Sequence, residues 1–136
     1  RHTRFKCDWS SDVCSSDLQY THARICALIR KAEEQGINWK GTVTPDGIHP
    51  SERDLIRLVS KYPEMLKTAA STYSPAVMAN YAYELSKGYN QFYQSVRIFG
   101  EPDREKFLFR ISLSAQVAAG IRRSLSLLGM GAPERM

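Results

Sequence analysis

The sequence has few of the residues from which metal and catalytic sites are built. Cysteine and histidine each occur three times in 136 residues, and neither forms a pair at the spacing of a metal site. No glycine-rich loop of the kind that holds nucleotide phosphates follows a strand-like segment. We therefore expect this chain to bind no metal or cofactor and to carry no catalytic activity by itself.

Long hydrophobic segments are also lacking. No run of apolar residues is long enough to cross a bilayer, and residues 19–136 carry no export signal, so we expect no membrane partner and a cytoplasmic location. The formal net charge is +5, and this modest excess suits a polyanionic partner without establishing one.

The first eighteen residues differ from the rest of the chain. Residues 1–18 show neither a helical nor a strand period, and their Ser/Asp-rich pattern resembles the translation of a common short-read sequencing adapter. We interpret residues 1–18 as non-native and disordered, and expect the native domain to occupy residues 19–136 with its upstream gene missing. The alternative is a disordered native leader. Excluding the tract removes Cys7 and Cys14 and leaves Cys26 on an apolar helix face.

From residue 19 onward, apolar residues recur at the three- and four-residue spacing of amphipathic helices. No segment alternates convincingly with a period of two. The sequence therefore predicts an all-α bundle of about five helices, over residues 19–35, from about 51, from 63, over 74–96 and over 103–128.

Helix starts and the buried face of the fourth predicted helix can also be assigned. Ser51 and Asp54 predict a capping box at the second helix. Gly88 lowers helix propensity and is expected to permit close approach of another helix. The residues expected to face the core share the three- and four-residue spacing: Met78, Tyr81, Ala82, Leu85, Tyr89, Phe92 and Val96.

Tyrosine and arginine are placed where they favour binding of single-stranded RNA. Tyr20 and Arg24 are four residues apart and so share one helix face. RNA loops are recognised through unstacked bases that stack on aromatic or guanidinium planes. Half-buried packing tyrosines are the simpler alternative. Further candidates for such a surface lie on the later helices: Tyr83, Asn90, Tyr93 and Arg123.

Two short motifs bracket this helical region. Residues 19–24 read Gln-Tyr-Thr-His-Ala-Arg, and residues 131–136 read Gly-Ala-Pro-Glu-Arg-Met. Together, at this separation, they resemble the beginning and end of the C-terminal anticodon-binding domain of arginyl-tRNA synthetases, the helical DALR domain. The resemblance covers essentially all of residues 19–136.

The resemblance implies a set of site residues. In the family, the Tyr and Arg of the first motif face the tRNA anticodon, and these are Tyr20 and Arg24 here. A Tyr late in the fourth helix corresponds to Tyr93, and the terminal Met, here Met136, approaches the same pocket. His22 matches the motif and is interpreted chiefly as a structural hydrogen-bonding residue.

The resemblance also implies the activity of the parent protein. It is expected to be an arginine–tRNA ligase, a class I aminoacyl-tRNA synthetase that uses ATP and Mg in a catalytic domain absent here. The fragment is expected to recognise tRNA(Arg), not DNA, as a monomer that is inactive in aminoacylation alone. The alternatives are the corresponding domain of another class I synthetase, such as the cysteinyl enzyme, or a helical protein-interaction module.

Overall fold

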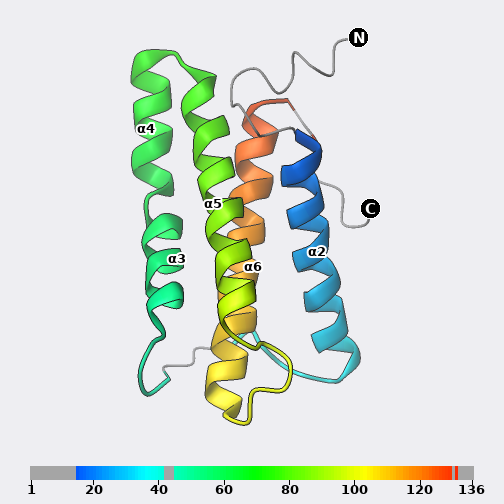
Figure 1. The fold of residues 1–136 in the computed structure, drawn as a ribbon. Coiled ribbons are helices and arrows are strands. Elements are labelled where there is room, and N and C mark those ends of the chain that lie inside the picture. Colours follow the sequence, from blue (N-terminus) through cyan, green and yellow to red (C-terminus); the bar gives the residue numbers. More distant parts are fainter. Residues whose placement is uncertain (1–14, 42–44, 130, 132–136) are drawn as a thin grey trace.

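The computed structural model describes residues 15–41, 45–129 and 131, and the regular elements in these ranges are all α-helices (Figure 1). This confirms the predicted all-α bundle of about five helices. None of the helices in the described ranges is long and apolar enough to cross a membrane. The helices are α2 (Ser15–Glu34), α3 (Pro50–Ser60), α4 (Tyr62–Thr72), α5 (Pro75–Ser95) and α6 (Arg104–Leu127).

The helices lie side by side as a long bundle. Only Lys61 separates α3 from α4, and these two helices stack end to end in one column that packs along α5 (Figure 1). Helices α2 and α5 run in the same direction, and α6 runs back between them (Figure 1). Both α2 and α5 contact α6 more extensively than they contact each other. This arrangement leaves room for a groove between α2 and α5.

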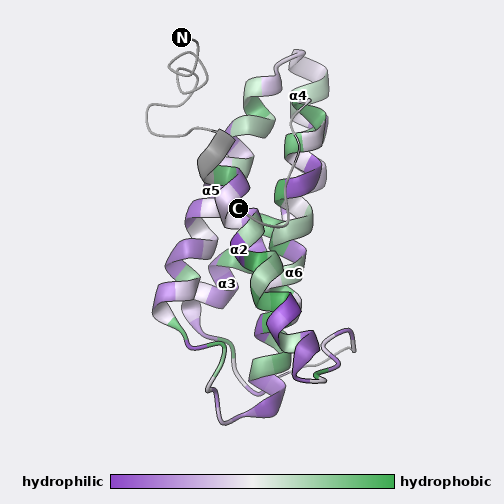
Figure 2. Cartoon of the chain, turned by 90° about the vertical axis from the view of Figure 1, so that its right-hand side faces the viewer, coloured by the Kyte–Doolittle hydropathy of each residue, from purple (hydrophilic) through white to green (hydrophobic). Residues whose placement is uncertain are grey.

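The core follows the predicted stripe of α5. Six of the seven residues expected to face inward are buried, and Val96, which follows the last residue of the helix, is half-buried. Helix α6 contributes Ile111, Val117, Ile121 and Leu125, each fully shielded from solvent. Hydrophobic and hydrophilic residues alternate along the helices in Figure 2, as expected for helices that each bury one face.

Two glycines set the separation of neighbouring helices. A Cβ atom added at Gly88 would lie 2.7 Å from the Leu58 side chain of α3, so the close approach predicted at this position is confirmed. A second such contact was not predicted from the sequence. A Cβ atom at Gly120 of α6 would lie 2.8 Å from the Leu85 side chain of α5. Both helix pairs are therefore closer than an alanine would comfortably permit.

The first helix begins earlier than predicted. We expected disorder up to residue 18, but α2 begins at Ser15 and Leu18 is only 1% exposed. The reason is periodicity, because Leu18 lies four and seven residues before two buried residues of the same helix, His22 and Ile25. Residues 1–14 lie outside the described ranges. The origin of residues 1–18 stays a prediction.

The cap of α3 also differs from the prediction. Ser51 and Asp54 do not form the capping box; His49 is the N-cap, and Glu52 is its partner. The His49 Nδ1 atom accepts a hydrogen bond from the Ser51 backbone N–H, while the His49 N–H donates to Glu52 at 2.8 Å. An imidazole nitrogen can replace the usual hydroxyl or carboxylate as acceptor, which the sequence pattern did not reveal.

A buried ionic cluster joins α3, α6 and the segment that connects α5 to α6. Arg110 Nε donates to Glu52 at 2.6 Å, and its Nη1 donates both to Glu101 and to the Arg97 carbonyl at 2.7 Å. Glu52 is 2% exposed and Arg110 is 6% exposed. Because His49 also donates to Glu52, both oxygens of this carboxylate are engaged, as burial of a charge requires.

Candidate nucleic-acid interface

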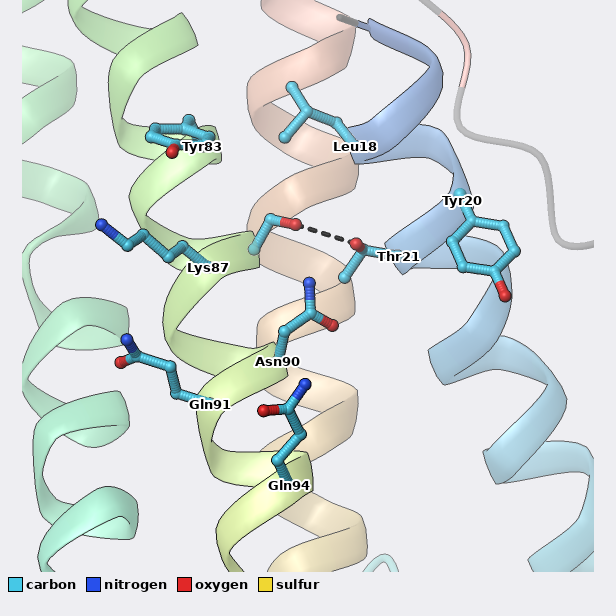
Figure 3. A pocket seen from close by; sticks show the side chains of 9 residues that line it. Leu18, Tyr20, Thr21, Tyr83, Lys87, Asn90, Gln91 and Gln94 are labelled. Carbon is cyan, nitrogen blue, oxygen red and sulfur yellow. Dashed lines mark hydrogen bonds between the residues drawn. The ribbon is translucent and has the colours of Figure 1, made fainter. Parts of the chain in front are cut away.

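A groove of about 340 Å³ opens between α2 and α5 (Figure 3). On its floor, Ser86 of α5 donates a hydrogen bond to the Thr21 hydroxyl of α2 at 2.8 Å, and both residues are buried. This bond ties the two helices together beneath the groove. The side chains along its edges come from α2 and α5: Tyr20, Tyr83, Lys87, Asn90, Gln91 and Gln94.

The two rings at the groove lie on opposite sides of it. Tyr20 extends from α2 and is 56% exposed, whereas Tyr83 is half-buried on α5 (Figure 3). A helical period explains both placements, because each tyrosine sits off the core stripe of its own helix. Flat aromatic faces open to solvent are the surfaces on which unpaired bases stack.

Next to the groove, Arg24 and Tyr93 form a stack between the same two helices. The Arg24 guanidinium carbon lies 4.4 Å from the centre of the Tyr93 ring, which is a cation–π contact. Arg24 also donates to the Asn90 amide oxygen at 3.3 Å. Since Asn90 lines the groove, it joins this stack to the groove, and the two form one continuous surface.

The buried Tyr89 packs against the Tyr93 ring of the Arg24–Tyr93 stack. The Tyr89 and Tyr93 ring centres are 6.2 Å apart, and the Tyr89 hydroxyl donates to Ser114 of α6 at 3.2 Å. Burial raises the Tyr89 pKa to about 12, so this phenol stays neutral under physiological conditions. The exposed aromatic surface is thereby anchored to the rigid core.

The structure brings together most of the residues that the sequence suggested for binding. Tyr20, Arg24, Asn90 and Tyr93 share the surface between α2 and α5, and Tyr83 lies on its far edge. Met136 lies outside the described residues. The Gln19 side chain nevertheless donates to the Gly131 carbonyl at 2.7 Å, which places residue 131 beside the start of α2.

Two supporting candidates lie elsewhere. His22 is 1% exposed and contacts the Cys26 sulfur at 3.8 Å inside the bundle, so it does not face the groove. This agrees with its interpretation as a structural residue. Arg123 is exposed on α6 and is not part of the groove lining.

The sequence did not predict the buried lining residues Leu18, Thr21 and Ser86, nor three exposed residues of α5 that also line the groove: Lys87, Gln91 and Gln94. A signal for the last three existed, because they continue the three- and four-residue spacing of Tyr83 and Asn90 along one polar face of α5. Polar residues on an exposed helix face are common, so the spacing alone did not distinguish a binding face from a solvated one.

The charge of the groove is weakly positive. Lys87 is the only charged side chain among the described residues that line it, and Arg24 lies beside it. The described part of the chain contains no group of three or more His, Cys, Asp or Glu side chains placed to hold a metal ion. Aromatic rings, carboxamides and cations on one surface are the groups with which proteins bind single-stranded RNA.

Fold and surface thus define an all-α domain with the features of an RNA-binding module, and comparison with known proteins gives its family. The model of the DALR anticodon binding domain matches residues 18–136. The arginine–tRNA ligase of Flavobacterium psychrophilum is 48% identical over 120 residues, which cover 88% of this chain and 19% of the ligase. That of Parabacteroides distasonis is 44% identical over 125 residues, covering 88% and 20% respectively.

A solved structure agrees with this assignment. Arginyl-tRNA synthetase of Thermus thermophilus superposes with a TM-score of 0.75 at 28% identity, over 90% of this chain and 21% of the synthetase. The chain belongs to the DALR anticodon-binding domain family. It spans about a fifth of the length of the ligases that it matches and corresponds to their C-terminal part.

Proposed function

We propose that this chain is the tRNA(Arg)-binding part of an arginine–tRNA ligase and that the groove between α2 and α5 receives the anticodon loop. The observation that carries the proposal is the meeting of Tyr20, Arg24 and Tyr93, from two helices, on one exposed surface. These are three of the four positions at which the family resemblance implies anticodon contacts. The full-length enzyme would act in the cytoplasm.

The proposed roles follow from the chemistry of each side chain. The Tyr20 and Tyr93 rings offer faces for unpaired bases, and Arg24 supplies a flat cation that can stack on a base. The bond between Gln19 and Gly131 places residue 131 beside the start of α2, where Tyr20 lies. This supports a role for Met136 as a wall of the same pocket.

In this proposal, aminoacylation itself belongs to the parent enzyme. ATP and Mg would serve its catalytic domain, which lies outside the segment matched here, while this fragment supplies recognition alone. Adding the 136-residue chain to tRNA(Arg), arginine, ATP and Mg should therefore yield no arginyl-tRNA. Detection of arginyl-tRNA above a protein-free control would contradict this part of the proposal.

Loss of a stacking ring tests the groove. In the full-length enzyme, Tyr20→Ala or Tyr93→Ala should raise the Michaelis constant for tRNA roughly 5- to 150-fold, because one stacked base contributes about 1–3 kcal/mol. The Michaelis constant for arginine should stay nearly unchanged. A suitable control is Tyr73→Ala, since Tyr73 is 92% exposed at the turn between α4 and α5, away from the groove. Equal changes for tRNA and arginine, or an equal effect of the control, would contradict the proposed site.

A further inference from the structure

An apolar pocket of about 270 Å³ lies between α4 and the last turn of α6, at the end of the bundle drawn uppermost in Figure 1. The buried Met78 of α5 lines it, together with the exposed residues Leu66 of α4 and Leu127 of α6. Among the described residues that line it, none is charged. Five of its apolar residues are called the apolar end below: Leu66, Ala69, Met78, Leu127 and Leu128.

Helix α4, which forms one side of this pocket, is incompletely covered. None of its eleven residues is buried, whereas α3, of the same length, buries Glu52 and Leu55. Helix α4 packs mainly on α5 and has fewer contacts with α3. A helix of this length is marginal in water by itself, and packing of its apolar face provides most of its stability. The apolar face of α4 is therefore open to a further protein segment.

The apolar end lies close to the start of α2. The first turn of α2, the α4–α5 turn and the last turn of α6 are at the same end of the bundle (Figure 1). Leu128 lines the pocket, and the carbonyl of Gly131, three residues later, accepts a hydrogen bond from Gln19 of α2. Three residues span at most about 11 Å. A polypeptide that leads into α2 thus passes near the pocket.

In the ligases that this chain matches, the matched segment is the C-terminal part, and most of the enzyme precedes it. We propose that the apolar end packs against an apolar surface of the polypeptide that precedes α2 in the parent ligase, with an apolar side chain of that polypeptide in the pocket. Burial of apolar surface on both sides drives this contact. The inference rests on the proposed function, which supplies the parent ligase.

The chemistry of the pocket favours this occupant over RNA or a small molecule. RNA-binding surfaces need cations and stacking groups, which the groove provides and the apolar end lacks. A volume of about 270 Å³ falls below the range of small-ligand sites, about 300–1,000 Å³. Tyr73 also borders the pocket, but it is almost wholly exposed and covers little of it. Contiguous apolar surface of this kind is typical of contacts between proteins.

Hydrogen exchange of the α4 amides tests the inference, with mass spectrometry of the 136-residue chain and of the full-length ligase. Exchange in the ligase should be slower by roughly tenfold or more, because a covered helix opens less often. The double variant Leu66→Gln, Leu127→Gln should remove most of this extra protection in the ligase. In the 136-residue chain it should change α4 exchange little, because both side chains are exposed there. Equal exchange of α4 in the two native proteins would overturn the inference.

Ile48→Gln is the matched control. Ile48 is 40% exposed, close to the 37% of Leu66, and it lies just before α3, at the opposite end of the bundle (Figure 1). This substitution makes the same kind of change in polarity and should leave the extra protection of α4 intact. The inference is also overturned if the double variant keeps the protection, or if Ile48→Gln removes it as completely.

Other occupants of the apolar end give different results. If α4 of the 136-residue chain is protected at high protein concentration and loses this protection on dilution, a second copy covers the pocket. If α4 of the ligase is protected only after tRNA(Arg) is added, RNA binding covers it. Either result would contradict the proposed contact with the preceding polypeptide.

The inference and the proposed function fail separately. Equal exchange of α4 in both proteins, together with a raised Michaelis constant for tRNA in Tyr20→Ala, would overturn this inference and leave the proposed function standing. A full-length protein that forms no arginyl-tRNA would contradict the proposed function itself, whatever the exchange of α4.

Discussion

Two arginines in this domain occupy opposite kinds of environment. Arg110 is 6% exposed, and its hydrogen bonds lead to two carboxylates and a backbone carbonyl. Arg24 lies on an exposed surface, where it stacks on a tyrosine and bonds to an amide, and no carboxylate of the described residues pairs with it. Arg110 is therefore neutralised within the fold, whereas Arg24 remains accessible to an anionic ligand.

The same contrast extends to the helices that carry the two residues. Arg110 joins α6 to α3 and to the segment before α6, where the chain is closely packed around a charge. Arg24 spans α2 and α5, which contact α6 more than each other and have a groove between them. The helices thus pack closely around the buried ions at Arg110, whereas the exposed rings and amides lie at the groove between α2 and α5.

The largest expected effect comes from removing the buried cation. Arg110→Met leaves Glu52 buried without its ionic partner and should lower the free energy of unfolding by about 3–5 kcal/mol. Urea denaturation followed by circular dichroism measures it. The matched change Arg24→Met should cost no more than about 1 kcal/mol, because its contacts are exposed. Similar losses for the two variants would remove the distinction between these arginines.

If Arg110→Met fails to fold, Glu101→Gln offers a milder change at the same cluster. Glu101 is the more exposed carboxylate partner of Arg110, so its charge is needed less than that of Glu52. Glu101→Gln should lower stability by less than Glu52→Gln does. The reverse order, measured by the same denaturation, would contradict the account of the cluster.

An intermediate effect is expected where α6 lies close against α5. Gly120→Ala introduces a methyl group 2.8 Å from Leu85, which is fully buried and has little room to move. Overpacking costs about 1–3 kcal/mol and alanine returns about 1 kcal/mol of helix propensity, so a net loss of stability should result. Gly88→Ala is the control, because the half-buried Leu58 can shift and the loss should be smaller. A more stable Gly120→Ala variant would contradict the tight α5–α6 contact.

The smallest effect is a pH dependence caused by a buried phenol beneath the groove. Burial raises the Tyr89 pKa to about 12, above the ordinary value of 10.0. Its protonated form therefore stabilises the fold fully below pH 10, and this contribution is lost as the pH rises to about 12. Between about pH 9 and pH 11 the loss should approach 1 kcal/mol.

Tyr89→Phe isolates that contribution. The variant should lose less stability than the native chain over the same pH range, while Tyr81, whose pKa is likewise raised to about 12, continues to titrate. Thermal unfolding at several pH values measures the difference. Identical pH profiles for the native chain and Tyr89→Phe would show that this phenol does not contribute.

Periodicity explains what the sequence analysis predicted well. The apolar stripe of α5 identified six buried residues correctly, because burial of one helix face imposes a fixed spacing. The pairing of Tyr20 with Arg24 on one face followed from the same geometry. Their approach to Tyr93 depends on how α2 and α5 pack on α6, which a local period does not contain.

The remaining features depend on contacts between distant segments. Glu52 and Arg110 are 58 residues apart, and each is a residue type normally read as part of a solvated face. The place of Leu18 was missed because residues 1–18 were interpreted as non-native and the first helix was expected to begin at residue 19, although Leu18 shares the helical period of His22 and Ile25. Lys87 and Gln94 can be assigned to the groove only from the folded structure, in which residues of α2 line the same groove.

The central claim is that RNA binds between α2 and α5. Its most direct test is a titration of the ¹⁵N-labelled chain with a stem-loop RNA that carries the tRNA(Arg) anticodon loop, followed through amide chemical shifts. The account predicts the largest changes at Tyr20, Arg24, Asn90 and Tyr93, with little change around Arg110. Changes concentrated around Arg110 or at the α4–α5 turn, with none at the groove, would contradict it.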